Sequence, residues 1–311
     1  MTPSSPPSTS LTKPLTRQDF RFSTRLRVRW AEVDLQKIVF NAHYLMYFDT
    51  AISDYWRAMA IPYEATMHQW GGDLYVKKAS VEYFASARYE DQLDVMLKCV
   101  KVGNSSVIFH GAIFRSDQLL VTCELIYVYA KPNNQGLSQQ AGQTSQSVPV
   151  AFRELLTAFE AAEPMTSLKT GDVAALGADA FAIREEVFVN EQGFALEIEK
   201  DAYDATSVHA VAYNRLGKPL ATGRLLPSNV VDGVKTSKIG RMAVHRVMRG
   251  SKLGRDILNC LVDAAKARGD AQVLLNAQWN AQNFYAKQGF TAQGEPFDDE
   301  GMPHIEMVKK L

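Results

Sequence analysis

Apolar and charged positions alternate at the start of the folded chain. Between residues 22 and 30, apolar or small residues occupy every second position and arginines stand between them: Phe22, Thr24, Leu26, Val28 and Trp30 against Arg25, Arg27 and Arg29. A period of two is typical of a half-buried strand. Between residues 42 and 59 the apolar spacing changes to three and four, which predicts a helix, and Pro62 stops its continuation.

Four strand-like runs follow this helix, at residues 74–88, 93–102, 106–115 and 119–131. Gly103-Asn104 and Ser116-Asp117 supply turns between the last three runs, so these predict an antiparallel meander. One long helix beside a meander of long strands is an α+β layer pair.

The second half of the chain alternates between helix and strand periods. The expected helices span 178–191, 252–268 and 281–288, and the expected strands span 208–213, 220–226, 238–244, 272–277 and 305–308. This order predicts a mixed α/β fold with a partly parallel sheet.

The 311-residue length favours two domains, and composition suggests where they divide. Residues 1–19 are rich in Ser, Thr and Pro and predict a disordered tail. A Gln- and Ser-rich linker is expected at 132–171, with a short amphipathic helix at 150–161. The two domains are therefore expected at 20–131 and 172–311.

Charge and cysteine content exclude several classes of protein. Thirty-four Lys and Arg balance 34 Asp and Glu, which argues against a nucleic-acid or membrane-surface binder. Cys99, Cys123 and Cys260 share no metal-ligand spacing and predict neither a metal site nor a disulfide framework. Without an apolar run near the ~18 residues of a membrane span or the apolar core of a signal peptide, the sequence favours a cytoplasmic protein.

The segment between the first strand and the long helix carries the first candidate chemistry. Asp34 lies there, followed by the expected helix start at 41–44. Free N–H groups at a helix start polarise a thioester carbonyl, and a carboxylate attacks it or activates water. An Asp before a helix is also a common N-cap or turn residue, so from the residues alone both interpretations stay open.

The order of residues in this segment resembles hotdog-fold acyl-CoA thioesterases of the 4-hydroxybenzoyl-CoA thioesterase and YbgC type. Asp34, Ile38-Val39-Phe40, Asn41, Tyr44 and the later run from Glu82 to Leu93 carry the resemblance. It implies an antiparallel sheet wrapped around a long helix, assembled as a homodimer or homotetramer.

Residue roles in the first half follow from the same resemblance. Asp34 is implied as nucleophile or general base, and Asn41 and Tyr44 as substrate-binding residues at the helix start. Lys37 stands where that family usually has Gly, so a turn that requires positive φ there is strained; alternatively, Lys37 meets a CoA phosphate.

A second candidate site lies in the second half, where a strand at 239–244 leads through a loop of small residues into a helix. Such a loop cradles a pyrophosphate through backbone N–H groups and the helix dipole. The stretch resembles the acetyl-CoA motif of GNAT N-acetyltransferases, with Arg249 and Gly254 at the motif's ends and Lys252 in place of its middle Gly. The CoA-binding residues implied are Met242, Val244, Arg249, Gly250, Lys252, Leu253, Gly254 and Arg255.

The run from Ala277 to Phe290 resembles the end of a GNAT domain, and the upstream residues from Arg184 to Arg224 resemble its ElaA-like branch. This implies that Tyr285 protonates the leaving thiolate and that Gln278 belongs to the binding site. A core aromatic residue is the structural alternative for Tyr285. The base that deprotonates the amine is left open among Glu186, Glu191, Glu199, Asp201 and His209.

Together these features predict a bifunctional acyl-CoA enzyme: a hotdog thioesterase followed by a GNAT acyltransferase, with acyl-CoA and an amine as substrates and no tightly bound cofactor. The rival hypothesis is a regulatory or CoA-sensing protein in which only one domain is catalytic. The two lysines at customary glycine positions, Lys37 and Lys252, support that rival.

Overall fold

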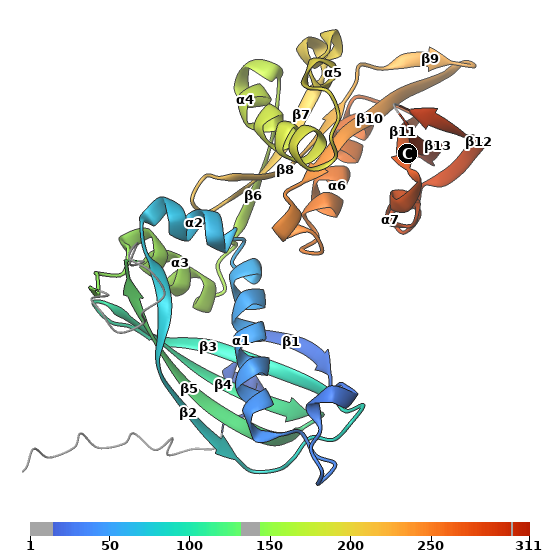
Figure 1. Cartoon of the computed structure of the whole chain (residues 1–311). Coiled ribbons are helices and arrows are strands. Elements are labelled where there is room, and N and C mark those ends of the chain that lie inside the picture. Colours follow the sequence, from blue (N-terminus) through green and yellow to red (C-terminus); the bar gives the residue numbers. More distant parts are fainter. Residues whose placement is uncertain (1–14, 132–143, 300) are drawn as a thin grey trace, which may run out of the picture. The chain divides into compact units, whose positions relative to one another are not determined.

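Each half of the chain builds one sheet with its own helices (Figure 1). The computed structural model describes residues 15–131, 144–299 and 301–311, and its contacts divide the chain into a first unit, Met1–Pro164, and a second unit, Met165–Leu311. The tail expected at 1–19 and the linker expected at 132–171 therefore lie partly outside the described residues.

The first unit is a five-stranded antiparallel sheet with helix α1 (Asn41–Ala58) across one face (Figure 1). This is the layer pair that the sequence predicts. The outer edge of β2 pairs with no other strand in the described part of the chain. The strand order is β1 (Phe22–Arg27), β3 (Gln92–Val102), β4 (Ser106–Arg115), β5 (Gln118–Ala130) and β2 (Asp73–Tyr83).

Aromatic residues fix α1 against the sheet. Its buried side chains recur every three or four residues, and Tyr55 contacts Phe22 and Phe109 edge to face at 5.3 Å between ring centroids. The Phe48 ring lies so close to Gly111 that a Cβ there would come within 2.6 Å of it. The helix thus approaches the sheet at a distance that only glycine permits.

Two segments expected as tail or linker pack onto the first unit instead. In the short turn η1 (Arg17–Asp19), Arg17 forms an ion pair with the buried Asp94 at 2.7 Å. Helix α3 (Val150–Glu160) buries its apolar face, and Glu160 accepts a hydrogen bond from the Tyr55 hydroxyl at 2.5 Å. Charge pairing holds the first of these segments on the unit, and burial of apolar side chains holds the second, although the neighbouring sequence is polar. A second helix, α2 (Tyr63–Trp70), follows α1 and was not expected from the sequence.

The second unit contains an eight-stranded mixed sheet. Helices α4 (Val173–Arg184) and α6 (Leu253–Ala267) pack on β7 and β8, which are buried along most of their length. The strand order is β12 (Thr291–Asp299), β13 (Met302–Lys310), β11 (Gln272–Gln278), β10 (Val234–Val244), β8 (Pro219–Leu225), β7 (Val208–Asn214) and β6 (Thr166–Gly171), with β9 (Asn229–Val231) on β10.

The only parallel pair in the described sheet is β10 with β11, and it opens partway along. The two strands pair from Thr236 to Lys238 against Gln272 to Leu274. Beyond this point β10 continues beside β8, through an irregularity between Gly240 and Ala243, while β11 continues beside β13. The sheet is therefore split where the two strands separate, and this split positions the second candidate site.

Several elements differ from the expectation. Strand β6 occupies residues expected as a connector, because its backbone pairs with β7. The expected helix at 178–191 begins at Val173 and continues past Arg184 as the π-helical segment η3 (Glu185–Glu191), and helix α5 (Leu196–Glu199) follows it. The final helix is short, at Gln282–Ala286 (α7). Among the described residues, no helix is both long and apolar enough to cross a membrane.

Candidate functional site

Asp34 lies in a tight hairpin immediately before α1. A bridge between Val33 and Val39 closes the hairpin, and the Asp34 N–H donates to the Ile38 carbonyl at 2.9 Å. One oxygen of the Asp34 carboxylate, Oδ1, accepts the Gln36 N–H at 2.8 Å, while the side chain stays half-buried. Asp34 is thus a turn residue, as the structural alternative predicts, and its second oxygen, Oδ2, has no partner among the described residues.

The N-terminus of α1 follows this hairpin directly. Phe40 occupies the N-cap position and no side chain caps the helix, so N–H groups of the first turn are left without a side-chain acceptor. The exposed Asn41 is the first helical residue, and its carbonyl accepts a hydrogen bond from Tyr83 at 3.2 Å. The structure thus brings the Asp34 hairpin and an open helix N-terminus together at consecutive positions.

Tyr44, expected to bind substrate, has a different position. Its side chain is only 2% exposed, and its hydroxyl accepts the Ala87 N–H at 2.8 Å. The Ala87 carbonyl in turn accepts the Val39 N–H at 2.9 Å. Through this hydrogen bond Tyr44 holds the segment around Ala87 against the hairpin. Because its ring is buried, it has no surface that could contact a ligand.

Sequence reasoning missed Glu32, a carboxylate buried at 3% exposure two residues before Asp34. Its side chain accepts hydrogen bonds from the Tyr47 hydroxyl at 2.7 Å and from Arg29. Burial raises the pKa of Glu32, but these hydrogen bonds outweigh it and leave the pKa below its ordinary value. The Glu32 carbonyl also accepts the Phe40 N–H at 2.9 Å, so Glu32 ties the hairpin to the start of α1.

In the second unit, a cavity of about 700 Å³ occupies the split between β10 and β11. Five of the residues considered from the sequence line it: Met242, Gln278 and Tyr285, and the candidate bases Glu199 and Asp201. Sequence reasoning gave no role to other lining residues, among them Lys238, Arg241, Asn276, His304 and Glu306. The polar residues at alternate positions of β11 and β13 were the signal that could have indicated them.

Tyr285 projects from α7 into this cavity. Its ring packs edge to face on Phe284, at 4.9 Å between centroids, and lies 6.0 Å from Phe290. Burial raises the pKa of Tyr285 to about 12, so the hydroxyl stays protonated at neutral pH. The residue is a core aromatic that also presents a proton donor to the cavity lining.

The expected phosphate loop lies between η5 (Arg246–Met248) and α6, outside the cavity lining. Gly250 and Lys252 both have positive φ, at 83° and 74°, and no side chain caps α6. The Arg249 guanidinium forms two hydrogen bonds of 2.7 Å with Glu191 at the end of η3. Of the other residues expected there, Val244 accepts a bond from Arg249, Leu253 is buried, Gly254 faces Phe284, and Arg255 pairs with Asp256.

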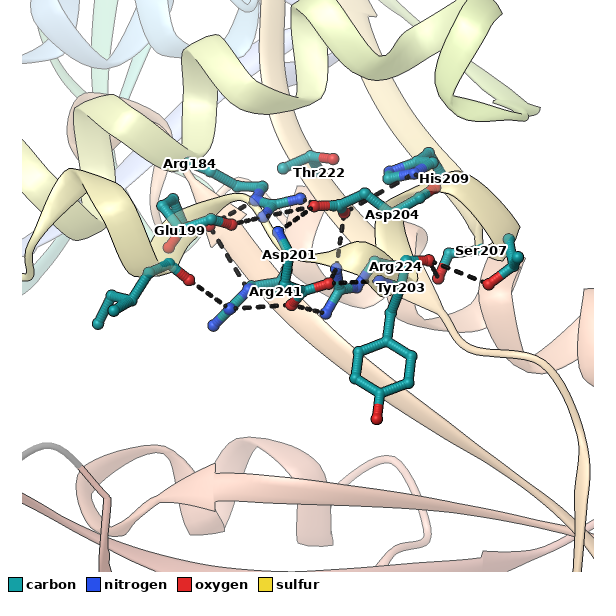
Figure 2. A network of polar contacts seen from close by, with 12 residues as sticks. Arg184, Glu199, Asp201, Tyr203, Asp204, Ser207, His209, Thr222, Arg224 and Arg241 are labelled. Atoms are coloured by element: carbon teal, nitrogen blue, oxygen red, sulfur yellow. Dashed lines mark hydrogen bonds and ion pairs between the residues drawn. The ribbon is translucent and has the colours of Figure 1, made fainter.

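A network of opposite charges borders the cavity (Figure 2). Arg184 and Arg224 both contact Asp204, at 2.8 Å and 2.6 Å, and Arg224 also contacts Asp201 at 2.7 Å. Arg241, which has a φ of 53° at the irregularity in β10, reaches Asp201 at 3.3 Å. The network comprises Arg184, Arg224, Arg241, Glu199, Asp201 and Asp204.

This pairing bears on the residues expected as bases. Glu199 is buried and bonded to Arg184, and Glu186 contacts His245 at 2.9 Å. Burial raises the pKa of Asp201, but its hydrogen bonds with Arg224 have the opposite and larger effect. The pKa of Asp201 is therefore below its ordinary value. His209 is fully buried and donates from Nε2 to the Asp204 carbonyl. Glu186, Glu191, Glu199 and Asp201 are therefore already engaged by neighbours, whereas the Nδ1 atom of the fully buried His209 has no hydrogen-bond partner among the described residues.

Comparison with known proteins defines the class of each unit. Residues 184–311 match the family model described as Acetyltransferase (GNAT) domain, and residues 36–122 match the model described as Thioesterase superfamily. The chain therefore joins a thioesterase-superfamily domain to a GNAT domain, and the expected hotdog and GNAT folds are confirmed.

Relatives are found for the second unit in particular. An uncharacterized N-acetyltransferase, YjcF, of Bacillus subtilis is 39% identical over 132 residues, covering 42% of this chain and 90% of that protein. Protein ElaA of Escherichia coli is 30% identical over 131 residues, covering 42% of this chain and 84% of ElaA. Through its second unit the chain belongs to the GNAT acetyltransferases.

Solved structures are similar to each half. The crystal structure of Escherichia coli ElaA is 27% identical, covering 47% of this chain and 99% of ElaA, with a TM-score of 0.41. A 1,4-dihydroxy-2-naphthoyl-CoA thioesterase from Synechocystis is 17% identical, covering 44% of this chain and 95% of that one, with a TM-score of 0.39. In the part of the chain that the structure describes, no group of three or more His, Cys, Asp or Glu side chains could hold a metal ion.

The positive φ of Lys37 and Lys252 leads to a stability prediction. Both exposed lysines have the left-handed conformation, at 62° and 74°, which costs a side-chain-bearing residue about 1–2 kcal/mol. Glycine avoids this cost but adds about 0.5–1 kcal/mol of chain entropy. We expect Lys37→Gly and Lys252→Gly each to raise the free energy of unfolding by about 0.5–1 kcal/mol in urea titrations. The matched controls Lys169→Gly and Lys266→Gly, in regular strand and helix, should lower it; a loss in all four variants would contradict the strain.

The buried charge network leads to a prediction about acid stability. The pKa of Asp204 is depressed: burial raises it, but hydrogen bonds from Arg184 and the Asp201 backbone outweigh this effect. A depressed carboxyl pKa stabilises the fold above the unfolded pKa of about 3.9, and this contribution is lost as pH falls toward the folded value. The second unit should therefore lose stability below about pH 4, as followed by calorimetry.

Asp204→Asn should lower stability at pH 7 by about 3–5 kcal/mol, because it removes the carboxylate that the buried guanidinium groups of Arg184 and Arg224 share. It should also weaken the dependence of stability on pH in the acid range. The exposed Asp263→Asn on α6 is the control and should change neither. An unaltered acid transition in Asp204→Asn would show that Asp204 contributes nothing to it.

Proposed function

We propose that the chain is a bifunctional acyl-CoA enzyme in which the first unit hydrolyses acyl-CoA thioesters and the second transfers an acetyl group from acetyl-CoA to an amine. The observation that supports hydrolysis is the half-buried Asp34 beside the uncapped N-terminus of α1, within a thioesterase-superfamily domain. Transfer is supported by the cavity in the β10–β11 split with Tyr285 in its lining, within a GNAT domain.

In the first unit, the backbone N–H groups at Asn41 and Ala42 polarise the thioester carbonyl. These groups carry the positive end of the helix dipole and have no side-chain cap. The Asp34 carboxylate then attacks the carbonyl carbon or takes a proton from water. Its Oδ2 is available for this step, since only Oδ1 is engaged by Gln36. Glu32 and Tyr47 hold the hairpin in place for this reaction.

In the second unit, Tyr285 donates a proton to the CoA sulfur as the thiolate leaves. The loop from Arg249 to Arg255 binds the CoA phosphates through backbone N–H groups at the start of α6. Met242 and Val244 follow the pantetheine arm along β10, and Gln278 lies opposite on β11. The bidentate pair between Arg249 and Glu191 positions that arginine at the loop.

A second candidate function is regulatory: one unit binds CoA without turning it over. The observation that favours it is the left-handed conformation of Lys37 and Lys252, because each places a side chain where the implied ligand approaches the backbone. Thiol release from a panel of acyl-CoAs, with and without an amine, separates the two functions. Release in both conditions supports the bifunctional enzyme, whereas binding without release supports the regulatory one.

Substitution of Asp34 tests the hydrolase. Asp34→Asn removes the negative charge but keeps an oxygen for the Gln36 N–H, so the hairpin should persist. We expect thioester hydrolysis to fall at least ~100-fold, the usual contribution of a general base or nucleophile. Asp49→Asn, on the exposed face of α1, is the control. Hydrolysis within a few fold of wild type in Asp34→Asn would reject the assignment.

Substitution of Tyr285 tests the transferase. Tyr285→Phe deletes the hydroxyl and retains the ring that packs on Phe284 and Phe290. We expect kcat for acetyl transfer to fall by ~100-fold or more while acetyl-CoA affinity changes little. Tyr203→Phe, an exposed aromatic that also lines the cavity, is the matched control. An unchanged kcat in Tyr285→Phe would leave Tyr285 as a core aromatic only.

We also propose that the first unit assembles as a two-fold homodimer or a homotetramer. Among the described residues no further strand pairs with the outer edge of β2, and Val76, Tyr83 and Phe84 are more than half exposed. Exposed edges and apolar side chains are a hazard unless another chain covers them. Light scattering should therefore give at least a dimer mass for the full chain and for a chain ending at Pro164. A chain starting at Met165 should be smaller; a monomeric but active first unit would overturn the assembly.

A further inference from the structure

One wall of the second-unit cavity carries polar side chains whose chemistry none of the assigned roles uses. Strands β11 and β13 pair antiparallel, with Gln278 opposite His304 and Asn276 opposite Glu306. Directly opposed residues share a face of the sheet, and all four of these line the cavity. The wall thus places an imidazole and a carboxylate two residues apart, beside the split that receives the acyl group in the proposed reaction.

The tautomer of His304 is fixed by its own strand. Its Nδ1 lies 2.8 Å from the Met302 carbonyl, and a carbonyl only accepts, so Nδ1 carries the proton. In the neutral ring, Nε2 is then the atom with the free lone pair. The described residues provide no hydrogen-bond partner for Nε2, and the ring is 9% exposed and stacked on Phe297 at 6.0 Å. His304 is therefore buried and oriented, with the lone pair of its neutral ring on Nε2.

Glu306 differs from Glu199 and Asp201, the two arginine-paired carboxylates of the cavity, in having no partner among the described residues. Asp201 and Glu199 on the opposite wall are neutralised by Arg224, Arg241 and Arg184. For Glu306 the described residues provide neither a hydrogen bond nor an ion pair, although the side chain is half-buried. A half-buried carboxylate without a cation is a site for a cationic ligand.

We propose that the β13 wall is the acceptor site: Glu306 binds the incoming alkylammonium and His304 takes its proton. This inference rests on the proposed acetyl transfer. The N–H bond of the ammonium breaks and its proton goes to Nε2 of His304. The neutral nitrogen then forms a C–N bond with the acetyl carbon. The C–S bond breaks, the thiolate takes the Tyr285 proton, and the remaining extra proton on the new amide nitrogen passes to the Tyr285 phenolate. The amide and Tyr285 are then neutral, and the imidazolium of His304 releases its proton to water.

The charge balance favours this assignment over the bases considered from the sequence. Glu186, Glu191 and Asp201 each contact a histidine or arginine, which competes for the lone pair that a base must use. His304, by contrast, keeps a free lone pair on Nε2, and it lies two residues from Glu306 on the same face of β13. The carboxylate that binds the ammonium and the nitrogen that takes its proton are therefore on one wall of the cavity.

The decisive substitution is His304→Asn, because the asparagine amide keeps a donor at the position of Nδ1 for the Met302 carbonyl. Acetyl transfer from acetyl-CoA is measured with butylamine and 1,4-diaminobutane between pH 7 and 10.5. We expect kcat/KM to fall at least ~100-fold at pH 7. The deficit should shrink as pH approaches the amine pKa of about 10.4, since the acceptor then arrives already neutral. A purely structural role for His304 would leave the deficit constant.

Glu306→Gln tests the binding half of the proposal. It should raise KM for 1,4-diaminobutane by ~10-fold, the scale of a lost charge-assisted hydrogen bond, with a smaller effect on kcat. The exposed Glu295→Gln on β12 and the exposed His68→Asn on α2 are matched controls and should match wild type. Acetyl-CoA binding by calorimetry should be unchanged in every variant, which confirms that the fold is intact.

The outcomes separate the two levels of the proposal. If wild type is active with both amines and His304→Asn is equally active at pH 7, the role of His304 is overturned and the transferase function stands. A deficit that stays constant with pH also overturns the role of His304. Wild type inactive with both amines, despite bound acetyl-CoA, overturns the transferase function and with it this acceptor site. For His304→Ala, recovery of activity by added imidazole supports the role, and absence of recovery contradicts it.

Discussion

Desolvated charge is the constraint on which the second unit depends. Arg184 is 1% exposed, and burying its guanidinium without a partner would cost too much desolvation free energy for the fold to be stable. Its partners come from elements distant in the chain: Glu199 from α5 and Asp204 from the turn before β7. Asp204 also holds Arg224 on β8, so satisfying one buried charge joins a helix, a turn and the sheet. That junction borders the cavity, and the network therefore fixes the wall opposite the proposed acceptor site.

Two lysines show how the fold overrides local preference. Lys37 and Lys252 occupy left-handed positions that glycine adopts without cost, and the surrounding hydrogen bonds keep them there. The Lys37 N–H donates to the Asp34 carbonyl at 2.9 Å, and the Lys252 carbonyl accepts from Asp256 at 3.0 Å. The sequence indicated the strain only through the resemblance, since neither lysine is unusual in composition or periodicity. Backbone conformation at such positions follows from the turn, not from the residue.

Periodicity predicted the long elements that bury one face and expose the other. Helix α1 was expected at 42–59 and spans Asn41–Ala58, because seven of its buried residues repeat every three or four positions. Strand β12 shows no such signal: all of its residues are exposed, and only its pairing with β13 defines it. Strand β6 was likewise missed. The alternation of polar and apolar residues on β13 indicates that His304 and Glu306 share one face. Their pairing with β11 depends on the tertiary structure and cannot be predicted from this pattern.

In the proposed reactions both units act on a thioester carbonyl, and the route of the proton determines which nucleophile attacks it. A carboxylate such as Asp34, beside a helix N-terminus, can activate water as the nucleophile. Water arrives neutral and gives its proton to the carboxylate as it attacks the carbonyl carbon. An amine arrives as a cation and must lose its proton first, which calls for a neutral base near an anion. A carboxylate paired with arginine is not a neutral base. His304 provides a neutral base, and Glu306 on the same wall provides the anion. The ion pairs of Glu199 and Asp201 therefore favour the wall of His304 and Glu306 as the proposed acceptor site.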